Sequence, residues 1–175
     1  MTNVTPVKFS AEDPVPVYGH RPEEAYLGSA QGEKKSTMLI VGAKGYLGSA
    51  LIARANTVGN VLGTSSSGGK GLLALRLDAP ADFEYDKIRH GDLVLLTAAI
   101  SAPDICAREH ERAWSVNVTG TSAFISRAIE RGARVIFFSS DTVYGEREDA
   151  FDEGASCNPA GEYALMKHEV EQRFA

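Results

Sequence analysis

The chain from residue 37 onward alternates short apolar runs with stretches of helical periodicity. Five runs have the length and continuity of strands buried on both faces of a sheet: Met38–Val41, Val61–Thr64, Leu72–Leu77, Leu93–Ala98 and Val135–Phe138. Helical spacing predicts helices over Gly45–Asn56, Ala81–Arg89, Ile105–Arg131 and Glu162–Phe174, with Gly132 as the stop of the third. That third helix is either broken near Thr119–Gly120 or continuous. The alternation indicates an α/β fold, a Rossmann-like doubly wound parallel sheet with helices on both faces.

Residues 1–36 differ from the rest of the chain in composition. They are rich in Pro, Glu, Gly and Ser and show no sustained period, which predicts an N-terminal leader that is extended or loosely packed. The length of 175 residues fits one domain, so residues 37–175 are the predicted folded domain.

Composition and charge exclude several classes of protein. With 43% hydrophobic and 23% charged residues, the chain has enough apolar material for a core. A net charge of -5 without a basic stripe argues against a nucleic-acid partner, and no apolar run reaches the roughly 18 residues of a membrane span. No secretory signal is recognisable, so we expect a cytoplasmic protein. The histidines and cysteines have no metal-ligand spacing: His20, His90, His110, His168, Cys106 and Cys157. We expect both cysteines to be reduced thiols.

A glycine-rich turn lies between the first strand and the first helix. It reads Gly42-Ala43-Lys44-Gly45-Tyr46-Leu47-Gly48, with the spacing G-x-x-G-x-x-G. In such a turn glycine lets the backbone approach a pyrophosphate, and the helix N-terminus offers free N–H groups and a positive dipole end. The alternative is a strand–helix turn with a close small-residue contact. The position before an amphipathic helix favours a dinucleotide site formed by Gly42, Gly45, Tyr46, Leu47 and Gly48.

The end of the second strand bears on the choice between NAD(H) and NADP(H). An acidic residue there would bind a ribose 2'-hydroxyl and repel a 2'-phosphate. This chain has Thr64, Ser65 and Ser66 followed by Lys70, and no acid. Hydroxyls and an ammonium suit a phosphate, which favours NADP(H) over NAD(H); the alternative is a flexible Ser/Gly loop.

Tyr163 and Lys167 stand four residues apart on the last predicted helix and therefore share a face. A neighbouring ammonium favours the phenolate and lowers the pKa of a tyrosine, which suits a general acid–base. Ser140, at the end of the fifth strand, would hydrogen-bond the oxygen that changes between carbonyl and alcohol. The alternative is an ordinary apolar stripe with Lys167 snorkelling beside it, formed by Tyr163, Met166, Val170 and Phe174.

The order of these motifs resembles the extended short-chain dehydrogenase/reductases, the NAD-dependent epimerase/dehydratase group. Within that group the chain is most similar to the dTDP-dehydrorhamnose reductase-like sugar-nucleotide reductases. The matching stretches run nearly end to end through residues 38–175: LIVGAKGYLGSAL, VLGTS, DLVLLTAAIS, AWSVNVTGT, ARVIFFSSDTVYGE and PAGEYALMKHEVE.

The resemblance implies roles for individual residues. Ser140, Tyr163 and Lys167 would be catalytic. Tyr163 and Lys167 would also contact the cofactor, with Lys167 at the nicotinamide ribose. Asp78 would contact the adenine amino group, and Ala98 and Ala99 would line the cofactor. Asn117 would also contact the cofactor, and it would stabilise the central helix and a proton relay. Two alternatives stay open, since Asp78 is also placed to cap a helix before Pro80, and Asn117 to satisfy buried backbone groups. Asp104 and the acidic segment 146–153 read as solvated surface.

The chain departs from the family at its C-terminal end. Family members continue beyond the Y-x-x-x-K helix with further strands and a lobe that binds the sugar nucleotide, whereas this chain ends at Ala175. We therefore expect a NAD(P)-binding Rossmann domain over 37–175 that lacks the usual C-terminal substrate lobe. Either the chain is a fragment, or a homodimer, a partner chain or residues 1–36 cover the exposed sheet face.

The resulting prediction is a NAD(P)-dependent oxidoreductase or epimerase. Its substrate would be a nucleotide-linked keto-sugar, with hydride transfer assisted by Tyr163 as general acid–base. The alternative is a non-catalytic NADP(H)-binding module that regulates or scaffolds a partner. No metal is expected to take part.

Overall fold

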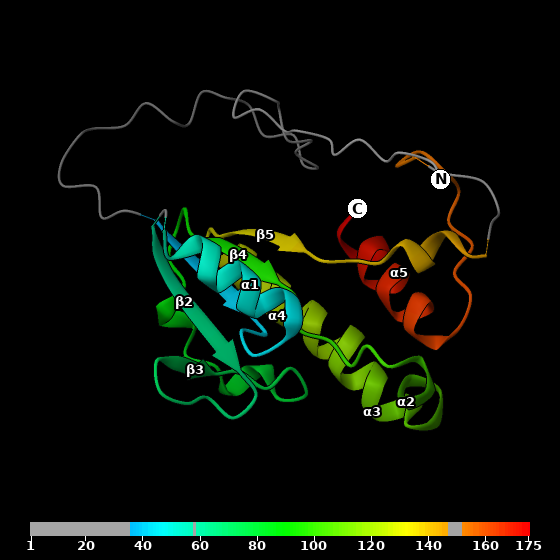
Figure 1. Ribbon diagram of the computed structural model, residues 1–175, viewed down its shortest axis with the longest axis horizontal. Helices are drawn as coiled ribbons and strands as arrows, with labels where there is room; N and C mark the ends of the chain where they lie inside the picture. The colour runs from blue at the N-terminus through cyan, green and yellow to red at the C-terminus, as the bar shows by residue number, and fades with distance from the viewer. Residues whose placement is uncertain (1–35, 58, 147–151) are drawn as a thin grey trace, which may run out of the picture. The chain divides into compact units, whose positions relative to one another are not determined.

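The computed structural model describes residues 36–57, 59–146 and 152–175, so the predicted leader lies outside the described residues except for Ser36. One parallel sheet has the strand order β3-β2-β1-β4-β5 (Figure 1). Its strands are β1 (Thr37–Val41), β2 (Asn60–Ser65), β3 (Leu72–Ala74), β4 (Leu93–Leu96) and β5 (Arg134–Phe137). The order runs outward from β1 in both directions, which makes the border of β1 and β4 the switch point of a doubly wound sheet. The predicted fold class is confirmed.

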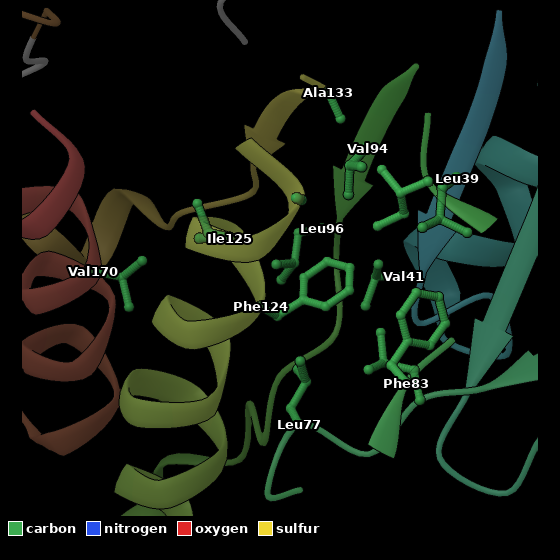
Figure 2. Close-up of a cluster of buried hydrophobic side chains, with 13 residues drawn as sticks. Leu39, Val41, Leu77, Phe83, Val94, Leu96, Phe124, Ile125, Ala133 and Val170 are labelled. Carbon is green, nitrogen blue, oxygen red and sulfur yellow. The ribbon is translucent and has the colours of Figure 1, made fainter. Parts of the chain in front are cut away.

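Each face of the sheet packs against different helices. Along β1, Leu39 and Val41 point to one face and Ile40 to the other, as the two-residue period of a strand requires. The first face packs on Phe124 of α4 (Thr121–Glu130), whose ring lies against the strands in Figure 2. The opposite face packs on Leu51 and other residues of α1 (Tyr46–Ala55), which lies in front of the sheet in Figure 1. Both faces are apolar, which explains the continuous apolar runs in the sequence.

The long helical region after β4 is divided into four segments. α2 (Pro103–Arg108) and α3 (His110–Trp114) meet at Glu109, whose φ of -115° and ψ of 46° are not helical. A π-helical turn, η4 (Ser115–Gly120), then leads into α4. At Gly120 an added Cβ would lie 1.4 Å from the carbonyl oxygen of Leu77. Only glycine fits this contact. The helix is not broken near Thr119–Gly120, because Gly120 has a helical φ of -71° and ψ of -38°; the chain continues there as a π-turn, and the interruption lies at Glu109 instead.

Besides this helical region, three predicted elements differ from the structure; one is the strand predicted over Leu93–Ala98, which ends at Leu96. The predicted helix over 81–89 is wrong: two single 3-10 turns, η2 (Pro80–Asp82) and η3 (Tyr85–Lys87), take its place. Phe83 and Ile88 are both buried, but on an α-helix a spacing of five residues would separate them by about 140°. The third strand ends at Ala74 rather than at Leu77 because its partner, β2, ends at Ser65.

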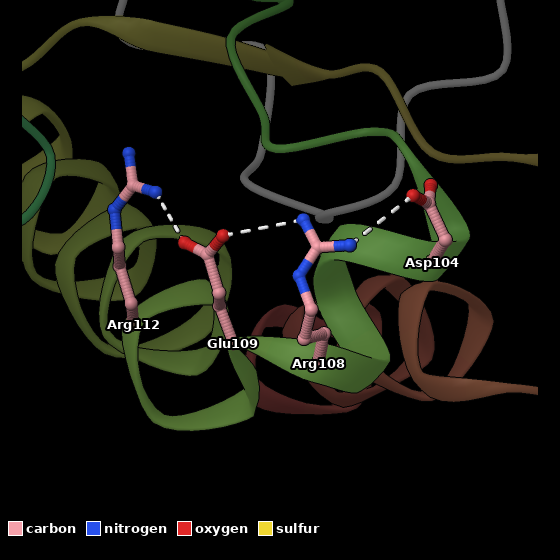
Figure 3. A network of polar contacts seen from close by, with 4 residues as sticks. All are labelled: Asp104, Arg108, Glu109 and Arg112. Carbon is pink, nitrogen blue, oxygen red and sulfur yellow. Dashed lines mark hydrogen bonds and ion pairs between the residues drawn. The ribbon is translucent and has the colours of Figure 1, made fainter.

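The outer surface of α2 and α3 carries a chain of ion pairs. Arg108 contacts Asp104 at 3.7 Å and Glu109 at 3.5 Å, and Glu109 also pairs with Arg112 (Figure 3). The side chain of Asp104 is 75% exposed, which confirms its interpretation as solvated surface. Exposed pairs of this kind contribute little to stability. Across the described residues, every helix is too short or too polar to cross a membrane.

The last helix and the last strand complete the framework. α5 (Glu162–Phe174) has the bounds that its periodicity predicts, and it packs on α4 through Val170. β5 is an edge strand of the described sheet, and the side chain of Ile136, next to Leu95 in the register, is 45% exposed. This edge therefore exposes one large apolar residue.

Candidate active site

The glycine turn lies against the end of β4. Gly42 has a φ of +93°, and an added Cβ would lie 2.9 Å from the backbone nitrogen of Ala98. At Gly48 an added Cβ would lie 2.1 Å from the carbonyl oxygen of Gly42. Both positions require glycine, because side chains there would meet backbone atoms. The turn is thereby held at the switch point between β1 and β4, where open α/β sheets bind ligands.

The first turn of α1 is open to an anionic ligand. Gly45 precedes the helix with an extended backbone, no side chain caps the first turn, and no acidic residue lies in it. Tyr46 is 92% exposed and Leu47 is also exposed, so neither residue fills the space in front of the helix. Free N–H groups at a helix N-terminus attract phosphates, and this arrangement fits the diphosphate of a dinucleotide.

The end of β2 brings hydroxyls and one ammonium together. Thr64 is buried, and its Oγ1 has no hydrogen-bond partner within the part of the chain that the structure describes. Ser65 donates from Oγ to the carbonyl oxygen of Gly68 at 2.8 Å, and Ser66 is exposed. Such a set of polar groups beside a glycine turn is consistent with a ligand-binding edge.

Lys44 is a basic residue of this edge that the sequence interpretation missed. Its Nζ donates to the carbonyl oxygen of Gly68 at 3.0 Å and lies 3.5 Å from Oγ of Ser67. The glycine turn touches β2 directly, since the backbone N–H of Ala43 donates to the carbonyl oxygen of Thr64 at 2.8 Å. Because of this contact between two segments distant in sequence, the Lys44 ammonium lies at the end of β2. Lys70 is an exposed residue that follows the strand.

Asp78 and Asn117 have well-defined partners. Asp78 forms an ion pair with Arg76 at 2.7 Å, which lowers the pKa of its carboxyl, and it does not cap the following 3-10 turn, where Ala79 is the N-cap. Asn117 accepts from the backbone nitrogen of Ile100 at 2.8 Å and donates to the carbonyl oxygen of Ile100 at 2.9 Å. The interpretation that Asn117 satisfies buried backbone groups is therefore confirmed. These two bonds attach η4 to the loop that follows Ala98 and Ala99, which are both partly buried.

Ser140 follows β5 and starts the 3-10 turn η5 (Asp141–Tyr144). Its Oγ accepts from the hydroxyl of Thr142 at 2.9 Å and from the backbone nitrogen of Thr142 at 3.3 Å. The same Oγ lies 3.3 Å from a carboxylate oxygen of Asp141. The hydroxyl is thus held at the carboxyl end of the sheet, the edge at which the sequence predicts it.

Lys167 is buried between β5 and Tyr163. The residue is 3% exposed, and its Nζ donates to the carbonyl oxygen of Phe138 at 2.6 Å. The same ammonium lies 4.3 Å from the ring centroid of Phe137 and 5.7 Å from that of Tyr163. The alternative of a lysine that snorkels to solvent is wrong, because the ammonium points into the protein.

Burial controls the proton affinities of this pair. It lowers the pKa of Lys167 to about 8, and the carboxylate of Glu171 partly opposes the shift. It also raises the pKa of Tyr163, with a smaller contribution from Cys106 in the same direction. The expected lowering of the tyrosine pKa by the ammonium is therefore wrong here: desolvation of the phenol sets the direction of the shift, and the ammonium is hydrogen-bonded to the carbonyl oxygen of Phe138.

Four of the predicted residues thus lie at the carboxyl ends of β1, β2, β4 and β5: Gly42, Thr64, Ala98 and Ser140. Tyr163 and Lys167 lie on α5, and the bond from Lys167 to Phe138 ties that helix to the end of β5. Asp78 instead follows β3, and Asn117 lies in η4. The family described as RmlD substrate binding domain matches residues 36–175. The chain belongs to this family. The resemblance to the epimerase and reductase group of short-chain dehydrogenases, drawn from the motifs, is confirmed by the relatives as well.

Three relatives of this RmlD-family chain illustrate the similarity. A dTDP-4-dehydrorhamnose reductase of Mycobacterium tuberculosis is 32% identical over 145 residues, which cover 79% of this chain and 45% of that protein. The structure of a hypothetical dTDP-4-dehydrorhamnose reductase from Sulfolobus tokodaii is 26% identical and has a TM-score of 0.69. The match covers 78% of this chain and 50% of that one. A short-chain dehydrogenase/reductase superfamily protein from Agrobacterium tumefaciens with bound NAD is 28% identical, with a TM-score of 0.65 and coverages of 78% of this chain and 43% of that one. The chain spans about half the length of these relatives.

Proposed function

We propose that this chain forms the cofactor-binding part of a NAD(P)-dependent oxidoreductase or epimerase that acts on a nucleotide-linked keto-sugar. The observation that carries the proposal is the burial of the Lys167 ammonium between the end of β5 and the ring of Tyr163. Removing a cation from water costs free energy. A packing role would be served equally by an apolar side chain, so a reactive group is the better explanation for a lysine here.

Each residue of this site has a separate role in the proposed reaction. The nicotinamide cofactor, when bound, supplies or accepts the hydride. Tyr163 transfers the proton at the substrate oxygen, Ser140 donates a hydrogen bond to that oxygen, and Lys167 orients the phenol and binds the nicotinamide ribose. The raised pKa of the free Tyr163 keeps the phenol protonated, as a proton donor to a carbonyl must be.

We further propose how the cofactor is held. The amides of the glycine turn at Gly42, Gly45 and Gly48 would bind the diphosphate, next to Tyr46 and Leu47. The hydroxyls at the end of β2 and Lys44 would bind a 2'-phosphate, which favours NADP(H) over NAD(H). The lining would be completed by Asp78, Ala98, Ala99 and Asn117.

The relatives support the substrate class. Two of them are named dTDP-4-dehydrorhamnose reductases, and a third holds NAD. A nucleotide-linked keto-sugar and a nicotinamide cofactor follow for this chain by analogy. A cytoplasmic location and a homodimer or partner chain that covers the exposed edge at β5 belong to the same proposal.

The test is hydride transfer from deuterium-labelled NADPH to a dTDP-linked keto-sugar, measured by mass spectrometry on the protein at its natural length. We expect label in the product, and a loss of about 10²–10⁴-fold in rate for Tyr163→Phe with unchanged cofactor affinity. Wild-type protein that binds NADPH and transfers no label would contradict the catalytic proposal. Equal rates for wild type and Tyr163→Phe would remove Tyr163 from the mechanism.

A further inference from the structure

A second cluster of chemically reactive side chains lies beside the C-terminal half of α5. One ligand atom each of Cys157, His168 and Glu171 lies within 4.8 Å of the other two. Nδ1 of His168 and a carboxylate oxygen of Glu171 are 3.4 Å apart. None of these residues belongs to the active site proposed above, and within the described segments this is the one group of three such side chains close enough together to hold a metal ion.

We infer that Cys157, His168 and Glu171 form a three-ligand site for a zinc ion. A thiolate, an imidazole and a carboxylate together are the ligands of a borderline-soft divalent ion, whereas Mg²⁺ and Ca²⁺ prefer oxygen alone. In a tetrahedral zinc site, bond lengths of about 2.0–2.3 Å place neighbouring ligand atoms about 3.4–3.7 Å apart. The His168–Glu171 pair already has such a separation at 3.4 Å, and Cys157 is at most 4.8 Å from either residue, about 1 Å beyond the range, so small side-chain rotations bring the ligands together.

The backbone around the cluster already holds its three ligands near each other. His168 and Glu171 are three residues apart on α5 and therefore lie on one face of the helix. Cys157 comes from the segment before α5, and the next residue, Asn158, donates from its backbone nitrogen to the carbonyl oxygen of Val143 at 3.0 Å. That segment also lies close to Gly145, where an added Cβ would meet the carbonyl oxygen of Asn158 at 2.3 Å. Binding an ion would require no rearrangement of these elements.

The ion would cross-link two segments next to the proposed active site. It would join α5, which carries Tyr163, to the segment that Asn158 attaches to η5, directly after Ser140. The helix and the strand end that carry the proposed catalytic groups would then be linked by a metal bridge. Three protein ligands leave the fourth position of a tetrahedral ion for water or for another side chain.

Sequence inspection misses this site because its spacing, C-x10-H-x2-E, matches no familiar metal motif. The helix pair alone is an ordinary i, i+3 contact, and a lone exposed thiol is unremarkable. Only the fold adds the thiol to the pair. The expectation that no metal takes part was drawn from spacing and did not consider this juxtaposition.

Zinc titration of the 175-residue chain, with competition from a chromophoric chelator, tests the inference. We expect one Zn²⁺ per chain and a rise in the unfolding temperature on binding. Cys157→Ser and His168→Ala should each weaken binding by more than roughly 100-fold, since even the loss of a ligand's hydrogen-bond partner costs about 10–100-fold. Circular dichroism of the zinc-free variants checks that both fold.

The matched control is Glu169→Gln, compared with Glu171→Gln. Both carboxylates lie on α5, but Glu169 pairs with Arg173 at 2.9 Å and takes no part in the cluster. We expect Glu171→Gln to weaken zinc binding and Glu169→Gln to leave it unchanged. Zinc affinity that is unaffected by Cys157→Ser, or Mg²⁺ that competes at equal concentration, would overturn the assignment. Because the readout is metal binding, these outcomes are independent of whether the chain binds a nicotinamide cofactor.

Discussion

The ammonium of Lys167 donates a 2.6 Å hydrogen bond to the carbonyl oxygen of Phe138. This bond joins the middle of α5 to the residue that follows β5, two positions before Ser140. It fixes the helix that presents Tyr163 relative to the strand end that presents Ser140. The ring of Phe137 covers the same ammonium at 4.3 Å, so the link is shielded from water on that side.

Lys167→Met separates the positioning role of the lysine from its contribution to stability. Methionine fills the space and removes a buried cation, which offsets the roughly 1–3 kcal/mol lost when the Phe138 carbonyl loses its partner. We expect the free energy of unfolding in urea to change by less than about 2 kcal/mol, while hydride transfer falls by about 10²-fold or more. Lys87→Met, at an exposed lysine of η3, is the matched control and should affect neither measurement.

The parts of the fold that follow from local pattern could be predicted. Continuous apolar runs identify strands such as Met38–Val41, because a parallel sheet is buried on both faces. The bounds of α5 follow from its helical periodicity, and those of α1 from the glycine turn before it. The positions of Tyr163 and Lys167 on one helix face require nothing beyond the helical repeat.

Other features depend on contacts that no local pattern encodes. The π-turn at η4 accompanies the close approach of Gly120 to Leu77, two residues more than forty positions apart. Lys44 reaches the end of β2 only because the glycine turn is hydrogen-bonded to Thr64. The direction of the Tyr163 pKa shift depends on how deeply the phenol is buried, which a spacing of four residues does not determine.

Lys44→Met should weaken NADPH binding more than NADH binding. A charge-assisted hydrogen bond contributes about 1.5–3 kcal/mol, so the dissociation constant for NADPH should rise by roughly 10- to 100-fold. NADH has no 2'-phosphate, and its affinity should change by less than about twofold. Fluorescence titration of the reduced cofactors measures both. Lys70→Met is the control for charge alone, and an equal loss of NADPH affinity in that variant would transfer the role to Lys70.

Gly48→Ala should abolish binding of both cofactors. The added methyl would lie 2.1 Å from the carbonyl oxygen of Gly42, so the turn must deform and its amides lose their alignment. Gly59→Ala offers a matched control, since an added Cβ there meets no atom within 4 Å. Calorimetric titration with NADPH measures the effect. Retention of wild-type affinity in Gly48→Ala would show that the turn does not hold the diphosphate.

Asn117→Ala should destabilise the chain by about 2–4 kcal/mol. The substitution leaves the backbone nitrogen and the carbonyl oxygen of Ile100 without the partners they have at 2.8 and 2.9 Å. Because Ile100 is only partly buried, each loss should fall in the lower part of the range of about 1–3 kcal/mol for a buried unpaired group. Asn60→Ala, at an exposed position of β2, should change the free energy of unfolding by less than about 0.5 kcal/mol. Urea denaturation compares the two, and similar midpoints would mean that the Asn117 bonds contribute nothing net.

The two cysteines should differ sharply in reactivity. Cys106 is fully buried, its Sγ lies 3.1 Å from the carbonyl oxygen of Ile100, and burial raises the pKa of its thiol, so little reactive thiolate forms. Cys157 is exposed. A thiol-specific chromogenic disulfide should therefore modify one thiol per native chain and two in denaturant. Cys157→Ser should abolish the native reaction, and Cys106→Ser should leave it intact. Fast modification of Cys106 in folded protein would show that the buried cluster of Cys106 and Met166, against which Tyr163 packs, opens to solvent.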